Sequence, residues 1–501
     1  MPVNHPRVLV PILALLFWLL PAGPQRVDAQ GPATVTIVHF SDVAELDPIE
    51  AGRVGGLSRL ATLIKDLKRT RQPVLLTLGG DFLSPSAIGT ARVDGEALGG
   101  RQTVDVLNRI GVDWATFGNH EFDISETAFR ARLAQARFGI VSSNVTDATG
   151  RPFAGTVQTA IVPFKVGGRH IRLGLIGLTI DSNAASWIRY QPPVEAAREQ
   201  LKQLAGRTDA VIALTHLGLE GDEELAVRYP EIDLVLGGHE HKNSYLRRGP
   251  RFIPLIQVDA NIRSVAVITM TFGRSGTRPT VSTRLQLVDE RIARDPEIES
   301  HIRRWTSAAF EGFTRGGFSP DRIIATTTEL LDGTEATVRN RPGKLTDLIL
   351  AGFVREAGPA DLALLNGGAI RIDDTLPPGP LTEYDVIRVL PFGGTVLKAS
   401  FDGSLVESVL DVGATKNQGT GGYLQTWGVS RAGNQWLVQG RPVDPARRYT
   451  VVLADFLLTG REVNLSFLTR ANPAVHDVQE FRDLRKPFID ELRATYPPAL
   501  R

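Results

Sequence analysis

Apolar and polar positions alternate along the first 290 residues in two kinds of segment. Short runs rich in β-branched and aliphatic residues predict buried strands at residues 34–40, 74–78, 112–117, 139–144, 171–178 and 210–216, with another from Ile232. Longer segments with apolar residues on one helical face predict helices at residues 57–71, 103–110 and 125–136. Strands that alternate with helices indicate a layered α/β domain whose sheets are mostly buried.

The pattern changes after residue 272. Residues 273–279 are rich in Gly, Arg, Ser, Thr and Pro and predict a loop. The last strand of the first domain is then predicted at residues 280–288. Residues 296–313 predict one long helix, which the run Gly316-Gly-Phe-Ser-Pro320 ends. A further strand, residues 361–365, follows in the last third of the chain.

Length and composition describe ordinary globular protein. The chain has 501 residues, 42% hydrophobic and 22% charged, with a net charge of +1, which predicts two or three domains. A charge so close to neutral argues against a nucleic-acid polymer or an anionic membrane as partner.

The amino terminus predicts export. His5 and Arg7 precede an uninterrupted apolar run, residues 8–20, and Val27-Asp-Ala29 offers a small-residue cleavage site before Gln30. We therefore expect residues 1–29 to be a signal peptide, and the mature protein to be periplasmic or extracellular without stable membrane insertion. An uncleaved anchor is the alternative, although the run is short for a membrane span.

Polar residues at the ends of the predicted strands carry the candidate chemistry. They are Asp42, Asp81, Asn119, His120, His216, His239 and His241. Any one alone would be a cap or loop residue, but several carboxylates and imidazoles that converge need a cation to offset repulsion and desolvation. The chain has no cysteine, so His, Asp, Asn or Glu must hold any metal. This mixture suits zinc, manganese or iron.

Five sequence blocks resemble one family. Asp42, Gly79-Gly-Asp81, Gly118-Asn-His-Glu121, Thr215-His216 and Gly238-His-Glu-His241 occur in the order found in calcineurin-like metallophosphoesterases, and within them the secreted 5′-nucleotidases. The resemblance implies a four-layer α/β/β/α metallophosphoesterase domain over residues 32–290 and a linker helix over 291–319. A smaller α/β C-terminal substrate-binding domain is then expected over 320–501.

The resemblance also implies residue roles around two divalent metal ions. Asp81 would bridge the ions, with Asn119, His216 and His239 completing one site and Asp42 with His241 serving the other. His120 would stand beside the phosphate as a catalytic residue, and Asp123 would hold its imidazole in one orientation.

One block departs from the family pattern. The family has Asp-x-His where this chain has Asp42-Val43-Ala44, and a methyl group cannot bind a metal. Three interpretations stay open: water completes the site, Glu45 or Asp47 replaces the histidine, or the site is weak. A carboxylate in place of imidazole would favour harder metals such as manganese.

The second domain resembles the family in three further blocks. Asn366-Gly-Gly-Ala-Ile-Arg371 implies substrate contacts from Asn366, Gly368 and Arg371, because glycines admit a close ligand and arginine binds phosphate. Leu390-Pro-Phe-Gly-Gly394 is the second block. Gly421-Gly-Tyr423 is the third, and the resemblance implies that Tyr423 is one of the two rings that sandwich a nucleobase in the family. Phe467 is either the second ring or core. Arg339 and Arg341 compete for a further arginine position.

The predicted function is hydrolysis of a nucleoside 5′-monophosphate to nucleoside and phosphate. The same site could act on 2′,3′-cyclic nucleotides or nucleotide sugars. A nucleotide-binding protein whose metal site Ala44 disables is the non-enzymatic alternative. The retained pair His120 and Asp123 argues against a pure binding role.

Overall fold

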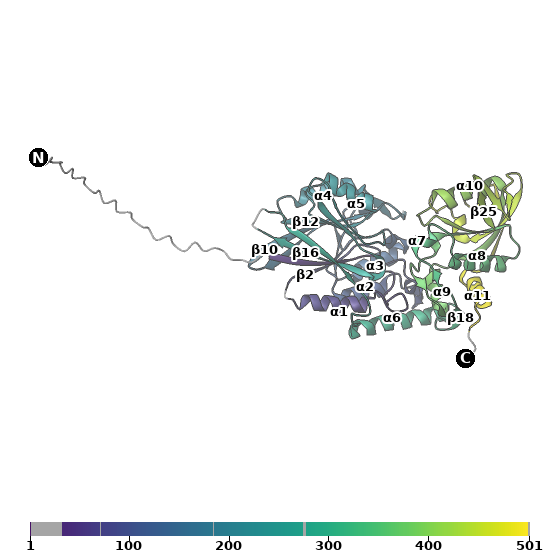
Figure 1. Ribbon diagram of the computed structural model, residues 1–501, viewed down its shortest axis with the longest axis horizontal. Coiled ribbons are helices and arrows are strands. Elements are labelled where there is room, and N and C mark those ends of the chain that lie inside the picture. Colours follow the sequence, from purple (N-terminus) through teal and green to yellow (C-terminus); the bar gives the residue numbers. More distant parts are fainter. Residues whose placement is uncertain (2–32, 71, 184, 274–276, 499–501) are drawn as a thin grey trace.

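The computed structural model describes residue 1 and residues 33–70, 72–183, 185–273 and 277–498. The apolar run of the predicted signal peptide and its cleavage site lie outside these residues. The described chain forms two bodies joined by α6 (Pro296–Arg315) (Figure 1). None of the helices in these ranges combines the length and apolarity needed to cross a membrane.

Two stacked sheets form the first body. The seven-stranded sheet has the order β17-β16-β1-β2-β5-β6-β8 and the six-stranded sheet the order β14-β15-β13-β12-β10-β9. The strands of the first sheet are β17 (Thr280–Leu287), β16 (Ser264–Phe272), β1 (Ala33–Phe40), β2 (Val74–Leu78), β5 (Trp114–Ala115), β6 (Gly139–Val141) and β8 (Thr156–Val157). Those of the second are β14 (Ser244–Arg248), β15 (Ile253–Gln257), β13 (Leu234–Gly237), β12 (Ala210–His216), β10 (Arg169–Thr179) and β9 (Thr159–Val166).

Apolar side chains fill the space between the two sheets. Ile37 and Leu75 from the first sheet pack with Leu173 and Leu214 from the second in one buried cluster. Helices cover the outer faces (Figure 1). They are α1 (Leu57–Lys68), α2 (Arg101–Ile110) and α3 (Glu126–Gln135) on the first sheet, and α4 (Pro193–Leu204) and α5 (Leu219–Arg228) on the second. The predicted four-layer α/β/β/α architecture is confirmed.

Parallel register brings the ends of neighbouring strands together. Phe40 at the end of β1 pairs with Leu78 at the end of β2, and His216 at the end of β12 continues a parallel ladder to β10 and β13. The loops after these strands therefore emerge at one edge, where ligands bind in layered α/β folds.

Short elements complete the first body. They are η1 (Ile88–Thr90), β3 (Arg92–Val93), β4 (Glu96–Ala97), η2 (His120–Asp123), β7 (Val145–Asp147), β11 (Ile188–Tyr190) and η3 (Ala260–Ile262). The strand predicted at residues 112–117 is much shorter than expected. Only β5 pairs in the sheet, because the chain turns at Gly118 and buries Phe117 against Phe122 and Phe129.

The second body is a five-stranded sheet between helices. Its order is β24-β20-β28-β23-β29. The strands are β24 (Leu424–Trp427), β20 (Leu362–Asn366), β28 (Arg448–Ala454), β23 (Thr395–Asp402) and β29 (Val475–Asp483). Two helices, α8 (Lys344–Ala357) and α11 (Arg485–Thr495), pack on one face, and α10 (Gly403–Asp411) packs on the other. This is the smaller α/β domain that the sequence predicted.

Smaller elements surround this sheet. They are β18 (Ile323–Thr327), β19 (Leu331–Asp332), α7 (Glu335–Val338), η4 (Gly367–Ala369), β21 (Thr375–Leu376), β22 (Gly379–Thr382), α9 (Glu383–Val389), η5 (Val412–Lys416), β25 (Val429–Ala432), β26 (Gln435–Val438), β27 (Arg441–Pro442) and η6 (Asp455–Leu458).

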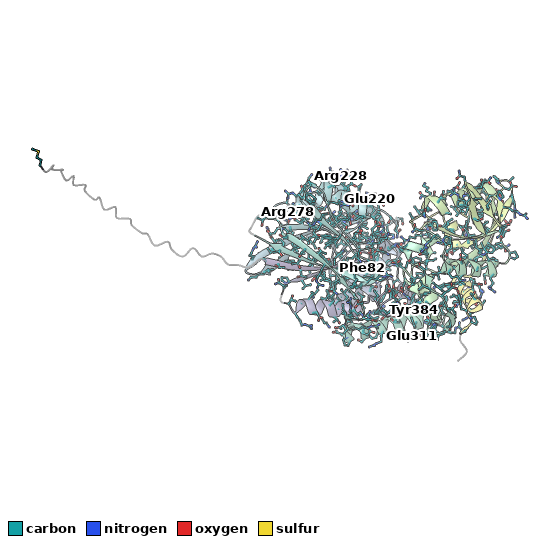
Figure 2. All side chains as sticks on the ribbon, viewed as in Figure 1. Phe82, Glu220, Arg228, Arg278, Glu311 and Tyr384 are labelled. Carbon is teal, nitrogen blue, oxygen red and sulfur yellow. The ribbon has the colours of Figure 1, made fainter. Side chains whose placement is uncertain are left out.

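Helix α6 packs against both domains. The helix begins at Pro296. The side chain of Asp295 caps its N-terminus by accepting a hydrogen bond from the N–H of Ile298. Ile298 and Ile302 join the core under α1 and α2. The ring of Phe310 lies 4.8 Å from that of Tyr384 in α9 at a tilt of 53°. Figure 2 labels Tyr384 in the lower part of the molecule. The buried side chains of α6 thus contact both domains. The boundaries 32–290, 291–319 and 320–501 stay a prediction.

Candidate metal and phosphoester site

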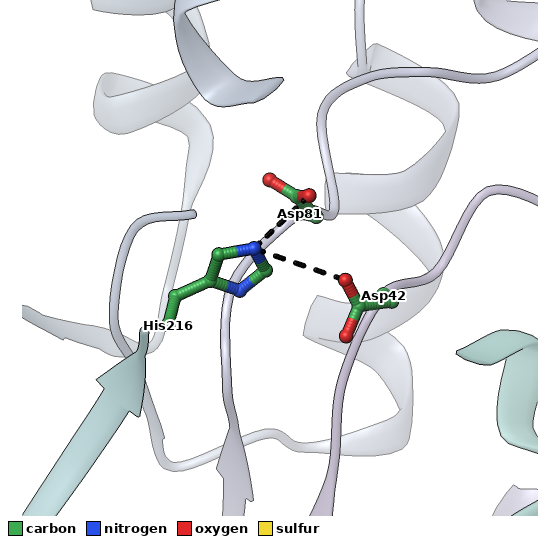
Figure 3. Close-up of side chains that lie close together, drawn as sticks. All are labelled: Asp42, Asp81 and His216. Atoms are coloured by element: carbon green, nitrogen blue, oxygen red, sulfur yellow. Dashed lines mark ion pairs between the residues drawn. The ribbon is translucent and has the colours of Figure 1, made fainter. Parts of the chain in front are cut away.

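Three of the predicted ligands form a tight cluster at the strand edge (Figure 3). Asp42 follows β1, Asp81 follows β2 and His216 ends β12. His216 Nε2 lies 3.1 Å from Asp81 Oδ2 and 3.8 Å from Asp42 Oδ1. All three side chains are buried, and each offers one ligand atom within 4.8 Å of the others.

Unpaired atoms in this cluster fit a cation. Asp42 Oδ1, Asn119 Oδ1 and His216 Nε2 are buried and make no hydrogen bond of good geometry, although buried polar atoms nearly always make one. Burial opposes ionisation of Asp42 and Asp81, but the His216 imidazole overrides it and holds the pKa of both carboxyls below the usual range. Burial also opposes protonation of His216, yet Asp81 and Asp42 raise its pKa to about 10. A divalent metal ion would supply the positive charge that these buried carboxylates need.

Neighbouring groups set the orientation and charge of the His216 and His239 rings. The carbonyl of Gly79 accepts a hydrogen bond from His216 Nδ1 at 2.7 Å, so Nε2 is the nitrogen that faces the carboxylates and that would bind a metal in exchange for its proton. The ring of His239 lies 5.1 Å from that of His216. Burial and the neighbouring His216 lower the pKa of His239 to about 4, so this imidazole is neutral and able to bind a metal.

The backbone is strained at four of the predicted ligands. Asp42, Asp81, His239 and His241 have positive φ angles of 56°, 51°, 82° and 52°. Such conformations cost about 1–3 kcal/mol each for residues other than glycine and cluster at functional sites.

Glycines in the motif blocks allow the loops to meet. A Cβ atom on Gly118 would stand 2.1 Å from Asp81 Oδ1, and one on Gly238 would stand 2.0 Å from Ser41 Oγ. These two motif positions therefore require glycine, because the loops that carry them pass too close to Asp81 and Ser41 for a side chain to fit.

Glu121 organises the cluster, a role that sequence reasoning missed. Its buried carboxylate accepts four backbone N–H groups: those of Phe82 (2.6 Å) and Leu83 (3.1 Å) at Oε1, and those of Asp81 (3.0 Å) and Gly118 (2.5 Å) at Oε2. One side chain thus ties the loop after β2 to the loop after β5.

His120 stands beside the cluster with its ring held from behind. Asp123 Oδ2 accepts a hydrogen bond from His120 Nδ1 at 2.6 Å. The amide of Asn183, a residue outside every motif, donates to the other oxygen of Asp123 at 2.9 Å. With its Nδ1 proton committed to Asp123, the imidazole presents Nε2 as its free nitrogen.

Neither carboxylate near Ala44 faces the site. Ala44 lines the pocket, but Glu45 and Asp47 do not. Glu45 Oε1 instead accepts from Nε of Arg388 in α9 at 3.0 Å. Burial raises the pKa of Asp47 to about 6. Neither Glu45 nor Asp47 therefore takes the place of the missing histidine in the described structure.

The pocket over the cluster lies between the domains. Asp42, Asp81, His120, His239 and His241 line it from the first domain, and Glu335, Arg339, Arg371 and Asp373 line it from the second. Arg339 is thus placed at the pocket, whereas Arg341 is not and turns toward Thr337. Glu335 pairs with Arg339 and lies 3.9 Å from Arg371.

The other predicted substrate residues lie apart from this pocket lining. Asn366 is buried and donates to Glu462 at 2.7 Å. Gly368 packs against Gly421, whose carbonyl accepts its N–H at 2.7 Å. Tyr423 is only 8% exposed, whereas Phe467 is 36% exposed and therefore not core.

Phe392 is an aromatic side chain that sequence reasoning did not assign. It belongs to the block Leu390-Pro-Phe-Gly-Gly394, is 50% exposed, and its ring lies 5.7 Å from the guanidinium of Arg371. An exposed ring beside a pocket arginine is better placed than the buried Tyr423 to receive a planar ligand group.

Two family models match the chain. The model described as calcineurin-like phosphoesterase matches residues 35–243, and the model of the 5′-nucleotidase C-terminal domain matches residues 323–469. The first match covers the residues of the metal cluster, and the second covers the pocket arginines.

Known proteins are similar over most of the chain. Protein UshA of Yersinia enterocolitica is 26% identical over 471 residues, which cover 81% of this chain and 82% of its own. The 5′-nucleotidase of Bos taurus is 26% identical over 459 residues, 82% of this chain and 77% of its own. The crystal structure of a 5′-nucleotidase precursor from Thermus thermophilus has a TM-score of 0.77 at 25% identity and covers 92% of this chain and 97% of that chain. The similarity extends across both domains.

Proposed function

The chain belongs to the 5′-nucleotidase family of metal-dependent phosphoesterases, and from that premise we propose that it hydrolyses nucleoside 5′-monophosphates to nucleoside and phosphate. The observation that carries the proposal is a single pocket with carboxylates and imidazoles on one wall and Arg339 and Arg371 on the other. In such a pocket the arginines can bind a phosphate group while the carboxylates and imidazoles hold a metal centre next to it.

The proposed cofactors are two divalent ions of zinc, manganese or iron. Asp42, Asp81 and His241 would hold one, and Asp81, Asn119, His216 and His239 the other. When bound, such a pair offsets the charge of phosphoryl oxygens and lowers the pKa of water.

The protein's own groups would complete the reaction. Arg339 and Arg371 would hold phosphate oxygens through charge-assisted hydrogen bonds. Their present partner is Glu335, which the phosphate would displace from the guanidinium groups. With its Nδ1 proton held by Asp123, His120 would act as an imidazolium whose Nε2–H donates a hydrogen bond to the phosphate and then its proton to the leaving oxygen. Asp123 and Asn183 would keep the ring in that orientation.

A substrate panel with metal-free protein tests the proposal. Phosphate release should be fastest from nucleoside 5′-monophosphates and should require an added divalent metal. Faster turnover of 2′,3′-cyclic nucleotides or nucleotide sugars would assign the site to those substrates. Binding of nucleotides without any turnover, for each metal added in turn, would identify a binding protein and refute the hydrolase proposal.

The nucleobase should rest on an aromatic side chain of the second domain. Replacing the true stacking residue with alanine should weaken nucleotide binding by about 1–3 kcal/mol and barely affect hydrolysis of a small aryl phosphate. The sequence points to Tyr423 and the structure to Phe392, so Phe392→Ala and Tyr423→Ala form a matched pair. Equal losses on both substrates in either variant would mean that its ring supports structure and not base recognition. Phe467→Ala tests the second ring in the same assay.

Restoring the family's histidine should strengthen one metal site. Metal titration of stripped wild-type protein should show two unequal events, because Ala44 contributes no ligand. Ala44→His should tighten the weaker event and shift its preference toward zinc. Glu45→Ala should leave both events unchanged, because Glu45 pairs with Arg388. A large loss of metal in Glu45→Ala would make Glu45 the replacement ligand, and two equal events in the wild type would contradict the weak-site proposal.

Export is proposed from the sequence alone. The mature protein should begin at Gln30, since Val27 and Ala29 satisfy the small-residue rule before the cleaved bond. Amino-terminal sequencing of protein recovered outside the cytoplasm checks this. A mature chain that retains residues 8–20 would contradict it.

A further inference from the structure

Asp373 of the second domain reaches a predicted metal ligand of the first. It lies in the loop between η4 and β21, and its Oδ2 accepts a hydrogen bond from His241 Nδ1 at 3.0 Å. The opposite nitrogen of the same ring, Nε2, lies 3.3 Å from Asp42 Oδ1. The imidazole is therefore held between a carboxylate behind it and the metal cluster in front.

Asp373 is itself fixed on several sides. Its Oδ1 accepts the N–H of Glu335 at 3.0 Å. Its main-chain carbonyl accepts from Nη2 of Arg263, in the first domain, at 2.6 Å. Its backbone has a positive φ of 37°, a strained conformation. The side chain is 14% exposed, so water competes little for the contact with His241.

An acceptor at Nδ1 changes what a ligand imidazole can do. It locks the proton on Nδ1, points the Nε2 lone pair at the metal position and raises the basicity of that nitrogen, and loss of such a partner typically lowers metal affinity 10–100-fold. The effect should be large here, because the site that includes His241 already lacks the ligand replaced by Ala44.

Glu335 is the competing partner for the same nitrogen. Its Oε2 lies 3.5 Å from His241 Nδ1, farther than Asp373 Oδ2. Its Oε1 is engaged by Arg339. The shorter contact and the independent anchoring by Arg263 identify Asp373 as the group that orients the ring.

We propose that Asp373 is a positioning residue by which the second domain orients His241 and sets the metal affinity of the site that contains it. This inference rests on the proposed function only in assuming a metal centre at the Asp42–Asp81 cluster. It links metal binding to the docking of the two domains, because the ligand and its orienting carboxylate come from different domains.

Metal titration of stripped Asp373→Ala and Asp373→Asn proteins tests the inference. Calorimetry with Mn²⁺ alone should show one of the two binding events weakened about 10–100-fold and the other unchanged. Selectivity for one event is a result that general damage to the interface would not give. Asp373→Asn keeps the size of the side chain and the positive-φ backbone, so it remains informative if Asp373→Ala folds poorly.

Asp374→Asn is the matched control. Asp374 is the adjacent carboxylate and also spans the interface, accepting from the Glu50 N–H at 3.2 Å and from Arg388 at 3.1 Å, but it does not contact His241. It should leave both metal events unchanged. Unchanged titrations in both Asp373 variants, or the same loss in Asp374→Asn, would overturn the inference. No nucleotide enters this experiment, so a wild-type protein that hydrolyses no nucleotide would refute the proposed function without deciding the role of Asp373.

Discussion

Replacing His120 with alanine should lower turnover of a nucleoside 5′-monophosphate roughly 10²–10⁴-fold and leave the metal content of the protein nearly unchanged. The imidazole is tied through Nδ1 to Asp123 at 2.6 Å and lies outside the buried cluster of Asp42, Asp81 and His216. Its contribution should therefore be proton transfer and charge stabilisation, not metal binding. The backbone N–H of residue 120, which donates to Asp81 at 2.8 Å, survives the substitution.

Two further variants make the His120 experiment decisive. Asp81→Ala should remove both metals, because Asp81 is the proposed bridging ligand. His476→Ala is a matched control, since His476 forms the same kind of histidine–carboxylate pair with Asp402 at 3.1 Å, in the second domain and on no wall of the pocket. Turnover and elemental analysis should be measured on the same preparations. Equal metal loss in the His120 and Asp81 variants would make His120 a ligand and the mechanism wrong.

The layered fold and the place of the cluster could be predicted because both follow from local pattern. Asp42 and Asp81 lie two and three residues beyond the ends of apolar strands, and parallel pairing of these strands puts their ends side by side. His216 similarly ends a strand that is buried along its whole length. The assignment of each residue to a metal or to catalysis remains a prediction, which the experiments above address.

Contacts between the domains could not be predicted from the sequence. His241 and Asp373 are 132 residues apart, and Glu45 and Arg388 are 343 apart. Hydrophobic periodicity describes how each domain folds but carries no information on how two folded domains dock. Glu45 turns away from the metal site because it pairs with Arg388 of α9. No sequence pattern in the first domain predicts that contact.

Exposure separates residues that the sequence treats alike. Tyr423 and Phe392 both lie in glycine-rich blocks, yet the first is 8% and the second 50% exposed. Asn183 carries no signal at all, because a single amide in a loop is common. Glu121 lies inside a recognised block, but only the turn of η2 shows that its carboxylate points into the protein and not toward the pocket.

Replacing Glu121 with glutamine should therefore destabilise the site strongly, although Glu121 is not one of the proposed metal ligands. The carboxylate accepts two backbone N–H groups at each oxygen. Glutamine keeps one oxygen and turns an NH₂ group toward two of those donors. A buried N–H without an acceptor costs about 1–3 kcal/mol, so the loss should be on the order of 2–6 kcal/mol. The melting temperature of the metal-free protein should fall by roughly 5–20 °C.

The same substitution should also loosen the loop that carries Asp81, so metal binding should weaken at both sites together. This distinguishes Glu121 from Asp373, whose loss should affect one site. Asp113→Asn is the control, because Asp113 is a carboxylate that accepts a single N–H, that of Leu76 at 2.8 Å, and asparagine retains an oxygen for it. Thermal unfolding and metal titration should be compared for the two variants. A Glu121→Gln protein that melts and binds metal like the wild type would show that the loops after β2 and β5 hold their positions without this carboxylate.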